Sequence, residues 1–160
     1  MQYTSQNARF SKCKSYRYNL SRSWSVDAEL PKVVFIGLNP SMADQRSDDP
    51  TIGRCAAFAK SWGYGGMEVV NLFAFCATRP VDLRLAPRPI GRGNDRCIAT
   101  AIASASLSIA CWGNHGQLLG RAEKVLRRYP QLHCLGRNAS GQPKHPLYIK
   151  STQRPFAIAP

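Results

Sequence analysis

The sequence predicts the α/β fold class, as a single three-layer domain in which helices flank a four-stranded parallel sheet, with an N-terminal β ribbon. Four short apolar segments alternate along the chain with segments of helical periodicity, which is typical of such sheets. The length of 160 residues suits one domain over residues 1–160. Aromatic residues dispersed through residues 1–30 favour strand pairing, so we expect this extension to supply edge strands.

Each expected element has its own local signals. The first strand, 32–38, is an apolar run that stops at an asparagine and a proline. The first helix, 48–66, has Asp49 as its expected cap, Pro50 in its first turn and Gly63 at its end. Asn94 is the expected cap of the second helix. The alternation continues with strands at 67–75, 107–113 and 131–136 and helices at 93–106 and 116–129.

Charge and composition narrow the class of protein. Twenty-two Lys and Arg stand against nine Asp and Glu, which gives a net charge of +13 and favours a polyanionic partner, nucleic acid above all. A hydrophobic content of 44% argues against disorder. No apolar run is long enough to span a membrane, and residues 1–20 lack a signal-like apolar core. We therefore expect a cytoplasmic protein with no membrane partner.

The six cysteines give no sign of a metal centre. They are scattered, with no C-x-x-C pair among them, whereas zinc and iron–sulfur sites usually draw ligands from close pairs. Several lie in apolar runs, where cysteine acts as a small buried residue. We expect reduced thiols, no metal, no cofactor and a monomeric chain.

Polar side chains gather where the expected strands end. Asn39 follows the first strand, Asn71 lies near the end of the second, and His145 lies in the loop after the fourth. Asn114 and His115 follow the third strand. Ligands of parallel α/β sheets bind beyond the carboxyl ends of the strands, so these residues predict a binding site at that edge.

At these residues the chain resembles a known group of enzymes. The segments GLNPS, NLFAF, WGNHGQ and HPLY occur in this order at strand ends, as in the uracil-DNA glycosylase superfamily. A closer resemblance is to a small domain-of-unknown-function family with the motifs LNPS, DDPT, GYGG, NLFA, WGNHG and GQPKHPLY. It extends from about residue 18 to the C-terminus, and the set is specific although each motif alone is weak. It implies a DNA glycosylase that leaves an abasic site.

The resemblance also implies roles for three residues. Asn39 matches the residue that positions the attacking water, and Asn71 matches the asparagine that reads the edge of a flipped base. His145 matches the histidine that stabilises the departing base. Breaking an N-glycosidic bond builds negative charge on the base, so a neutral histidine that donates a hydrogen bond suits this step.

The first motif carries an asparagine where the uracil branch has a carboxylate. An amide orients water but cannot deprotonate it, so we expect an acid to assist, or a base that departs unaided. Asp44, Asp48 and Asp49 are the nearest acids, and Asp44 is the preferred one. On the same reasoning an aspartate in place of Asn39 would be tolerated.

Further residues are candidates for contacts with the base and with DNA. Ser41 and Phe73 are the base-binding candidates, although core packing explains Phe73 at least as well. The chain lacks the second proline of the usual H-P-S-P element, so the wedge that opens the duplex falls to other residues. The candidates for wedge and phosphate contacts are Leu147, Tyr148, Lys144 and Arg137.

The segment 41–50 points to a substrate. It is small and polar, where the uracil branch excludes bulk at pyrimidine C5 with an aromatic side chain. We expect a pocket for a bulky, hydroxylated C5 group on double-stranded DNA, such as the glucosylated hydroxymethylcytosine of phage genomes, which would make the protein an anti-phage defence enzyme. The alternatives are a uracil or mismatch repair glycosylase, an enzyme acting on free nucleotides, and a non-catalytic nucleic-acid-binding module.

Overall fold

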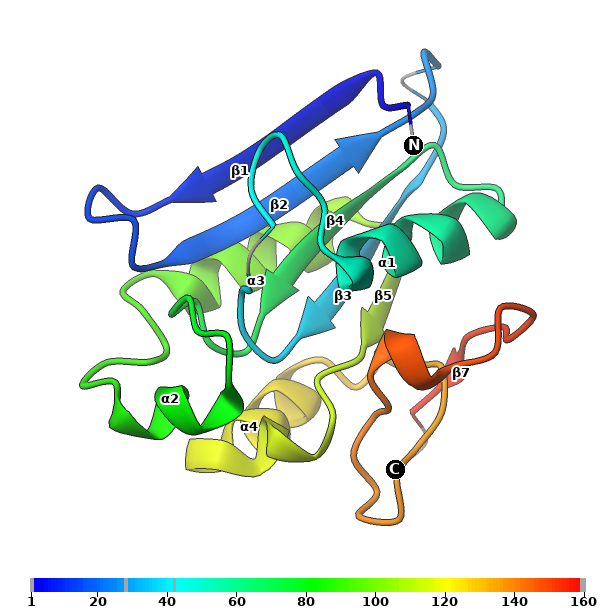
Figure 1. Cartoon of the computed structure of the whole chain (residues 1–160). Helices are drawn as coiled ribbons and strands as arrows, with labels where there is room; N and C mark the ends of the chain where they lie inside the picture. The colour runs from blue at the N-terminus through cyan, green and yellow to red at the C-terminus, as the bar shows by residue number, and fades with distance from the viewer. Residues whose placement is uncertain (1, 28, 42, 159–160) are drawn as a thin grey trace.

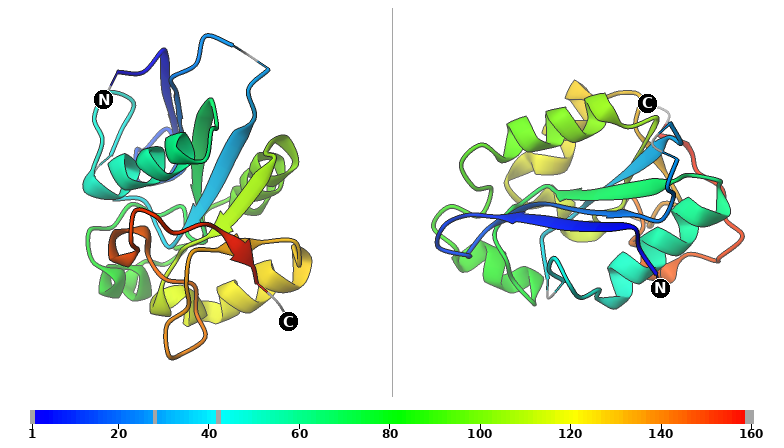
Figure 2. Two further views of the ribbon diagram at one scale, coloured as in Figure 1. Left: turned by 90° about the vertical axis from the view of Figure 1, so that its right-hand side faces the viewer. Right: turned by 90° about the horizontal axis from the view of Figure 1, so that it is seen from above.

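A seven-stranded sheet with helices on both faces makes up the described part of the computed structural model, which covers residues 2–27, 29–41 and 43–158 (Figures 1 and 2). Met42, in the polar segment discussed above, lies outside the described residues. The strands are β1 (Ser5–Phe10), β2 (Arg17–Ser23), β3 (Lys32–Gly37), β4 (Gly66–Asn71), β5 (Leu107–Ala110), β6 (His133–Cys134) and β7 (Phe156–Ala157). The helices are α1 (Pro50–Ser61), α2 (Pro80–Leu85), α3 (Asn94–Ser104) and α4 (Arg121–Arg128), with 3-10 turns η1 (Asn114–Gly120) and η2 (Pro146–Tyr148).

The sheet is mixed, so the predicted four-stranded parallel sheet is wrong. The strand order is β1-β2-β4-β3-β5-β6-β7, and β1–β2, β2–β4 and β6–β7 pair antiparallel. The N-terminal ribbon of β1 and β2 belongs to the same sheet, because β2 pairs antiparallel with the edge of β4. At the other end β7 pairs with the short strand β6. Both additions depend on long-range pairing that no local sequence pattern encodes.

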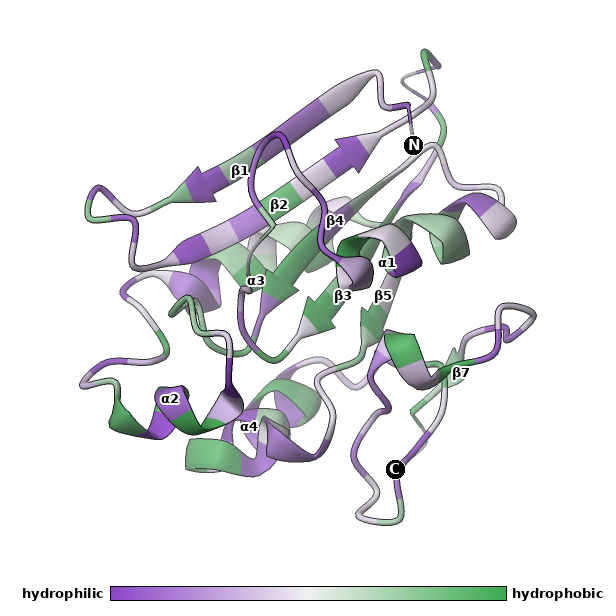
Figure 3. Cartoon of the chain, in the orientation of Figure 1, coloured by the Kyte–Doolittle hydropathy of each residue, from purple (hydrophilic) through white to green (hydrophobic). Residues whose placement is uncertain are grey.

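The central strands are apolar on both faces because helices cover both sides (Figure 3). Val33 and Phe35 of β3 pack in one cluster with α1, whereas Val34 and Ile36 pack in the other cluster with α3 and α4. All four are fully buried. The outer strands β1 and β2 are much more polar along their length, as Figure 3 shows. None of the helices in the described residues is long and apolar enough to cross a membrane.

The helices follow the predictions in part. For α1 the prediction is confirmed: the Asp49 carboxylate accepts from the Ile52 backbone N–H at 2.8 Å, Pro50 stands in the first turn, and Gly63 follows with φ +87°. Asn94 is not the cap of α3. Its side chain is buried, and its Nδ2 donates to the backbone carbonyls of Asn71 at the end of β4 and of Leu72 directly after it. The helix expected at 116–129 is broken by left-handed residues at Leu119 and Gly120, and only α4 is a true α-helix.

A buried arginine of β2 holds the segment between β3 and α1. The side chain of Arg22 is fully buried, and its Nε donates to the Asp48 carboxylate at 2.9 Å. Its Nη2 donates to the backbone carbonyls of Asp44 and Ser47. Burying a cation requires this degree of pairing, so the segment 44–48 is fixed against the N-terminal strands.

Replacing Arg22 by methionine tests this attachment. We expect the free energy of unfolding to fall by about 1–3 kcal/mol, because the change removes the guanidinium donor of the Asp44 and Ser47 carbonyls, while the Asp48 carboxylate keeps its hydrogen bond from Tyr3. The matched control is Arg79→Met, since the side chain of Arg79 is 73% exposed and pairs with Asp82 at the surface. Such pairs contribute less than about 1 kcal/mol. Urea denaturation measures both variants, and equal losses would contradict the account.

Candidate functional site

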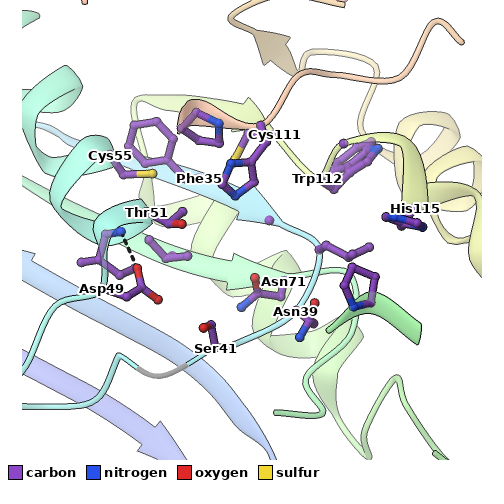
Figure 4. Close-up of a pocket in the computed structure, with 18 of the residues that line it drawn as sticks. Phe35, Asn39, Ser41, Asp49, Thr51, Cys55, Asn71, Cys111, Trp112 and His115 are labelled. Atoms are coloured by element: carbon purple, nitrogen blue, oxygen red, sulfur yellow. Dashed lines mark hydrogen bonds between the residues drawn. The ribbon is translucent and has the colours of Figure 1, made fainter. Parts of the chain in front are cut away.

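A pocket of about 550 Å³ opens where the parallel strands β3, β4 and β5 end (Figure 4). We call it the strand-end pocket. The loops that follow these strands supply most of its wall, and the first turn of α1 closes one side. Seven residues predicted for this site line it: Asn39, Ser41, Asn71, Asn114, His115, His145 and Tyr148. Its volume lies within the range of about 300–1,000 Å³ that small-molecule sites occupy.

Asn71, the last residue of β4, presents a buried amide to this pocket. It is 3% exposed, and its Nδ2 has no hydrogen-bond partner within the described residues. Gly37 at the end of β3 makes room for it, because a Cβ there would lie 2.7 Å from the Asn71 Oδ1. A buried polar atom without a partner costs about 1–3 kcal/mol. A ligand in the pocket can supply the missing acceptor.

Asn39 is held rigidly by two backbone carbonyls. Its Nδ2 donates to the carbonyl oxygens of Pro40 at 2.9 Å and Ala77 at 2.7 Å. Carbonyls only accept, so the nitrogen end of the amide is fixed toward them and Oδ1 remains to bind a ligand. The loops after β3 and β4 are joined further by hydrogen bonds from the backbone N–H of Phe73 to Leu38 and of Ala77 to Pro40.

His145 precedes the turn η2, and its ring caps that turn. The Nδ1 accepts from the Leu147 backbone N–H at 3.4 Å, so the neutral imidazole carries its proton on Nε2. Burial lowers the pKa of His145 below its ordinary 6.5, and the opposing effect of Asp49 is weaker. The ring is therefore a neutral donor at pH 7. Directly after η2, the Ile149 carbonyl accepts a hydrogen bond from the Arg54 guanidinium on α1. This bond attaches the turn that follows His145 to α1.

The loop that carries His145 is tied to the end of β5 by residues of two sequence motifs. The Gly113 N–H donates to the Pro143 carbonyl at 2.9 Å, and the Trp112 Nε1 donates to the Gln142 side chain at 2.8 Å. Gly116 must be a glycine, because a Cβ there would lie 2.1 Å from the buried Trp112 ring. The segments WGNHG and GQPKHP therefore fold as one unit that positions the histidine.

The acid of the pocket is Asp49 rather than the preferred Asp44. The Asp44 carboxylate is exposed and accepts from the backbone N–H groups of Arg46 and Ser47, so it closes its own turn and does not belong to the pocket lining. Asp49 lines the pocket while it caps α1. Both acids follow Asn39 closely in the sequence. Spacing alone therefore could not show that Asp44 binds its own turn whereas Asp49 reaches the pocket.

The other candidates are divided between core and surface. Phe73 is fully buried in the cluster beneath α3, so the structure places it away from the strand-end pocket. Leu147 is 44% exposed and Tyr148 is 81% exposed, on the turn beside the pocket. Lys144 is half-buried with its stem against Gly136. The exposed residue Arg137 lies on the same loop, where its backbone bridges to Pro143.

A family model described as "Protein of unknown function (DUF1643)" matches residues 17–147. The chain belongs to the DUF1643 family. No curated protein and no solved structure matches it. These comparisons therefore identify the family but give no activity, and they do not link the chain to the uracil-DNA glycosylase superfamily.

One further residue of this DUF1643 domain lines the pocket and was missed by sequence reasoning. Arg17, the first residue of β2, is 2% exposed, and its Nη1 donates to the Ala43 carbonyl. Its Nε has no hydrogen-bond partner within the described residues. Burial lowers the pKa of this guanidinium, with the neighbouring Cys76 and Asp49 acting in the opposite sense. The only sequence signal was its place in a basic, aromatic stretch.

The protonation of His145 can be measured directly. The unfolded chain binds this proton more readily than the folded DUF1643 domain, so stability falls as the pH drops through 6.5. In an NMR titration we expect the His145 imidazole to titrate below 6.5, with the neutral form protonated on Nε2. The variant His145→Gln identifies the signal. A midpoint at or above 6.5 would contradict the burial of this ring.

Proposed function

We propose that this DUF1643 chain is a DNA glycosylase that hydrolyses the N-glycosidic bond of a modified pyrimidine. Its family would then be a small branch of the uracil-DNA glycosylase superfamily. The observation that carries the proposal is the buried, unpartnered amide of Asn71 in a pocket that it shares with Asn39 and His145. A nucleobase edge offers both acceptors and donors, which a fixed amide can pair with.

The chemistry divides among three groups. Water adds to C1′ of the sugar as the C1′–N bond breaks, and the bonding electrons leave with the base. The Asn39 Oδ1 accepts a hydrogen bond from the attacking water, since its Nδ2 is occupied by backbone carbonyls. The neutral Nε2–H of His145 donates to the base oxygen where negative charge develops. Asp49 is the carboxylate in the pocket that can take the proton of water and offset positive charge on the sugar.

A polar end of the pocket supports a substrate with a hydroxylated C5 group. Asp49 and Thr51 lie beside α1 in Figure 4, and Ser41 and Arg17 also line the pocket. The Arg17 Nε has no partner among the described residues. Hydroxyls, a carboxylate and a guanidinium bind sugar hydroxyls well, which favours glucosylated hydroxymethylcytosine of phage DNA over uracil.

Double-stranded DNA is the partner that the remaining features favour. The net charge of +13 exceeds what a free nucleotide requires. A base in a duplex must be flipped out before it can enter a pocket, and an apolar side chain inserted into the stack assists this step. Leu147 and Tyr148 are exposed on the turn that His145 caps, so they stand where such a wedge would enter.

Single-turnover excision on duplex oligonucleotides tests the proposal. We expect abasic-site formation with glucosylated hydroxymethylcytosine, and slower reaction with hydroxymethylcytosine or uracil. Asn39→Ala should lose on the order of 10²-fold or more in rate while DNA affinity changes little. Asn71→Ala should relax or abolish the choice of base. Uracil as the best substrate would refute the proposed substrate.

The structure changes the expectation for Asn39→Asp. A carboxylate there would face the carbonyl oxygens of Pro40 and Ala77 in place of the donor, so we expect a loss of activity rather than tolerance. Melting curves control for folding in each variant. Full activity in a folded Asn39→Ala protein would remove this residue from the mechanism, and binding without excision of any of these bases would favour a non-catalytic module.

A further inference from the structure

A second groove, of about 520 Å³, lies between α3 and the N-terminal strands, on the face of the sheet opposite α1. We call it the ribbon groove. Residues of β1 and β2 form one wall, one flank of α3 forms the other, and Glu68 of β4 also lines it. The lining residues are Asn7, Arg9, Phe10, Tyr18, Asn19, Glu68, Arg92, Gly93, Arg96, Cys97 and Thr100. None of them lines the strand-end pocket.

Three guanidinium groups give this groove a positive charge. Arg9 comes from β1, Arg92 from the turn that precedes α3, and Arg96 from the first turn of α3, so the charges belong to both walls. Arg9 is held in place: its Cζ lies 5.7 Å from the centre of the Tyr18 ring, and its Nη2 lies 2.7 Å from the Cys97 sulfur. A guanidinium donates paired N–H groups to phosphate oxygens, so arginines on both walls are well suited to bind a phosphate group between them.

One acid lies among these cations. Glu68 is half-buried, and its Oε1 accepts from the Asn19 Nδ2 at 2.9 Å. Burial raises the pKa of this carboxyl, and the hydrogen bond from Asn19 opposes the shift. A carboxylate accepts hydrogen bonds from N–H donors, so it would repel a bare phosphate but attract an amino group on the same ligand.

We propose that the ribbon groove binds a nucleotide, with its phosphate between the three arginines and its base edge at Glu68. The ligand is either a free nucleotide or one nucleotide of a nucleic-acid strand, since both present the same groups. Because Glu68 only accepts when ionised, bases with an exocyclic amine, such as cytosine, bind better than uracil. The proposal is independent of the chemistry in the strand-end pocket.

Calorimetric titration of the full chain tests the proposal with cytidine monophosphate, uridine monophosphate, a short single-stranded oligocytidylate and inorganic phosphate. We expect Arg92→Ala and Arg96→Ala each to weaken nucleotide binding about tenfold or more. Arg127→Ala is the matched control: it removes the same charge from an exposed position on α4 and should change affinity less than about twofold. Arg92 and Arg96 do not line the strand-end pocket, so a loss of binding in their variants locates the nucleotide in the ribbon groove.

Glu68→Gln provides the second, sharper readout. We expect this variant to lose the preference for cytidine over uridine monophosphate while it keeps its affinity for the phosphate. Arginine-dependent binding of the oligonucleotide alone would identify the ligand as a strand, and equal dependence for the mononucleotide would identify a free nucleotide. Inorganic phosphate binding as tightly as either, or no effect of Arg92→Ala and Arg96→Ala, would overturn the proposal.

Discussion

The buried guanidinium of Arg22 is the contact on which the candidate site depends. It joins β2 to the segment between β3 and α1 through the Asp48 carboxylate and the carbonyls of Asp44 and Ser47. That segment runs from the end of β3, where Asn39 stands, to the Asp49 cap of α1. Arg17, at the start of the same strand, adds a bond to the Ala43 carbonyl. The N-terminal strands therefore do more than extend the sheet, because they fix one wall of the strand-end pocket.

The residues matched by the family model include the strand that fixes this wall of the pocket. The match begins at residue 17, so both buried arginines of β2 lie within the matched range 17–147, and β1 lies before it. The strand β2 also contributes residues to both the strand-end pocket and the ribbon groove. Arg17 turns to the strand-end pocket, and the next residue, Tyr18, turns to the ribbon groove. Alternation along a strand sends neighbours to opposite faces, so one strand can serve both sites.

The sequence predicted those parts of the site that depend on local patterns. Apolar runs that end in polar residues located Asn39 and Asn71, and helix-capping signals located Asp49 and Pro50. Contacts made across long sequence separations could not be predicted in this way. The pairing of β2 with β4, the burial of Arg17 and Arg22, and the choice of Asp49 over Asp44 as the pocket acid all depend on packing. Phe73 shows the same limit, since apolar character alone does not tell a core residue from a stacking platform.

The central claim is that the chain cleaves the bond between base and deoxyribose. Glucosylated hydroxymethylcytosine contains two glycosidic bonds, so the product identifies the reaction. Mass spectrometry of the small molecules released from a duplex with this base should detect hydroxymethylcytosine that still carries its glucose, together with an abasic strand. Release of glucose alone, or no release by a folded protein that binds the duplex, would contradict the account.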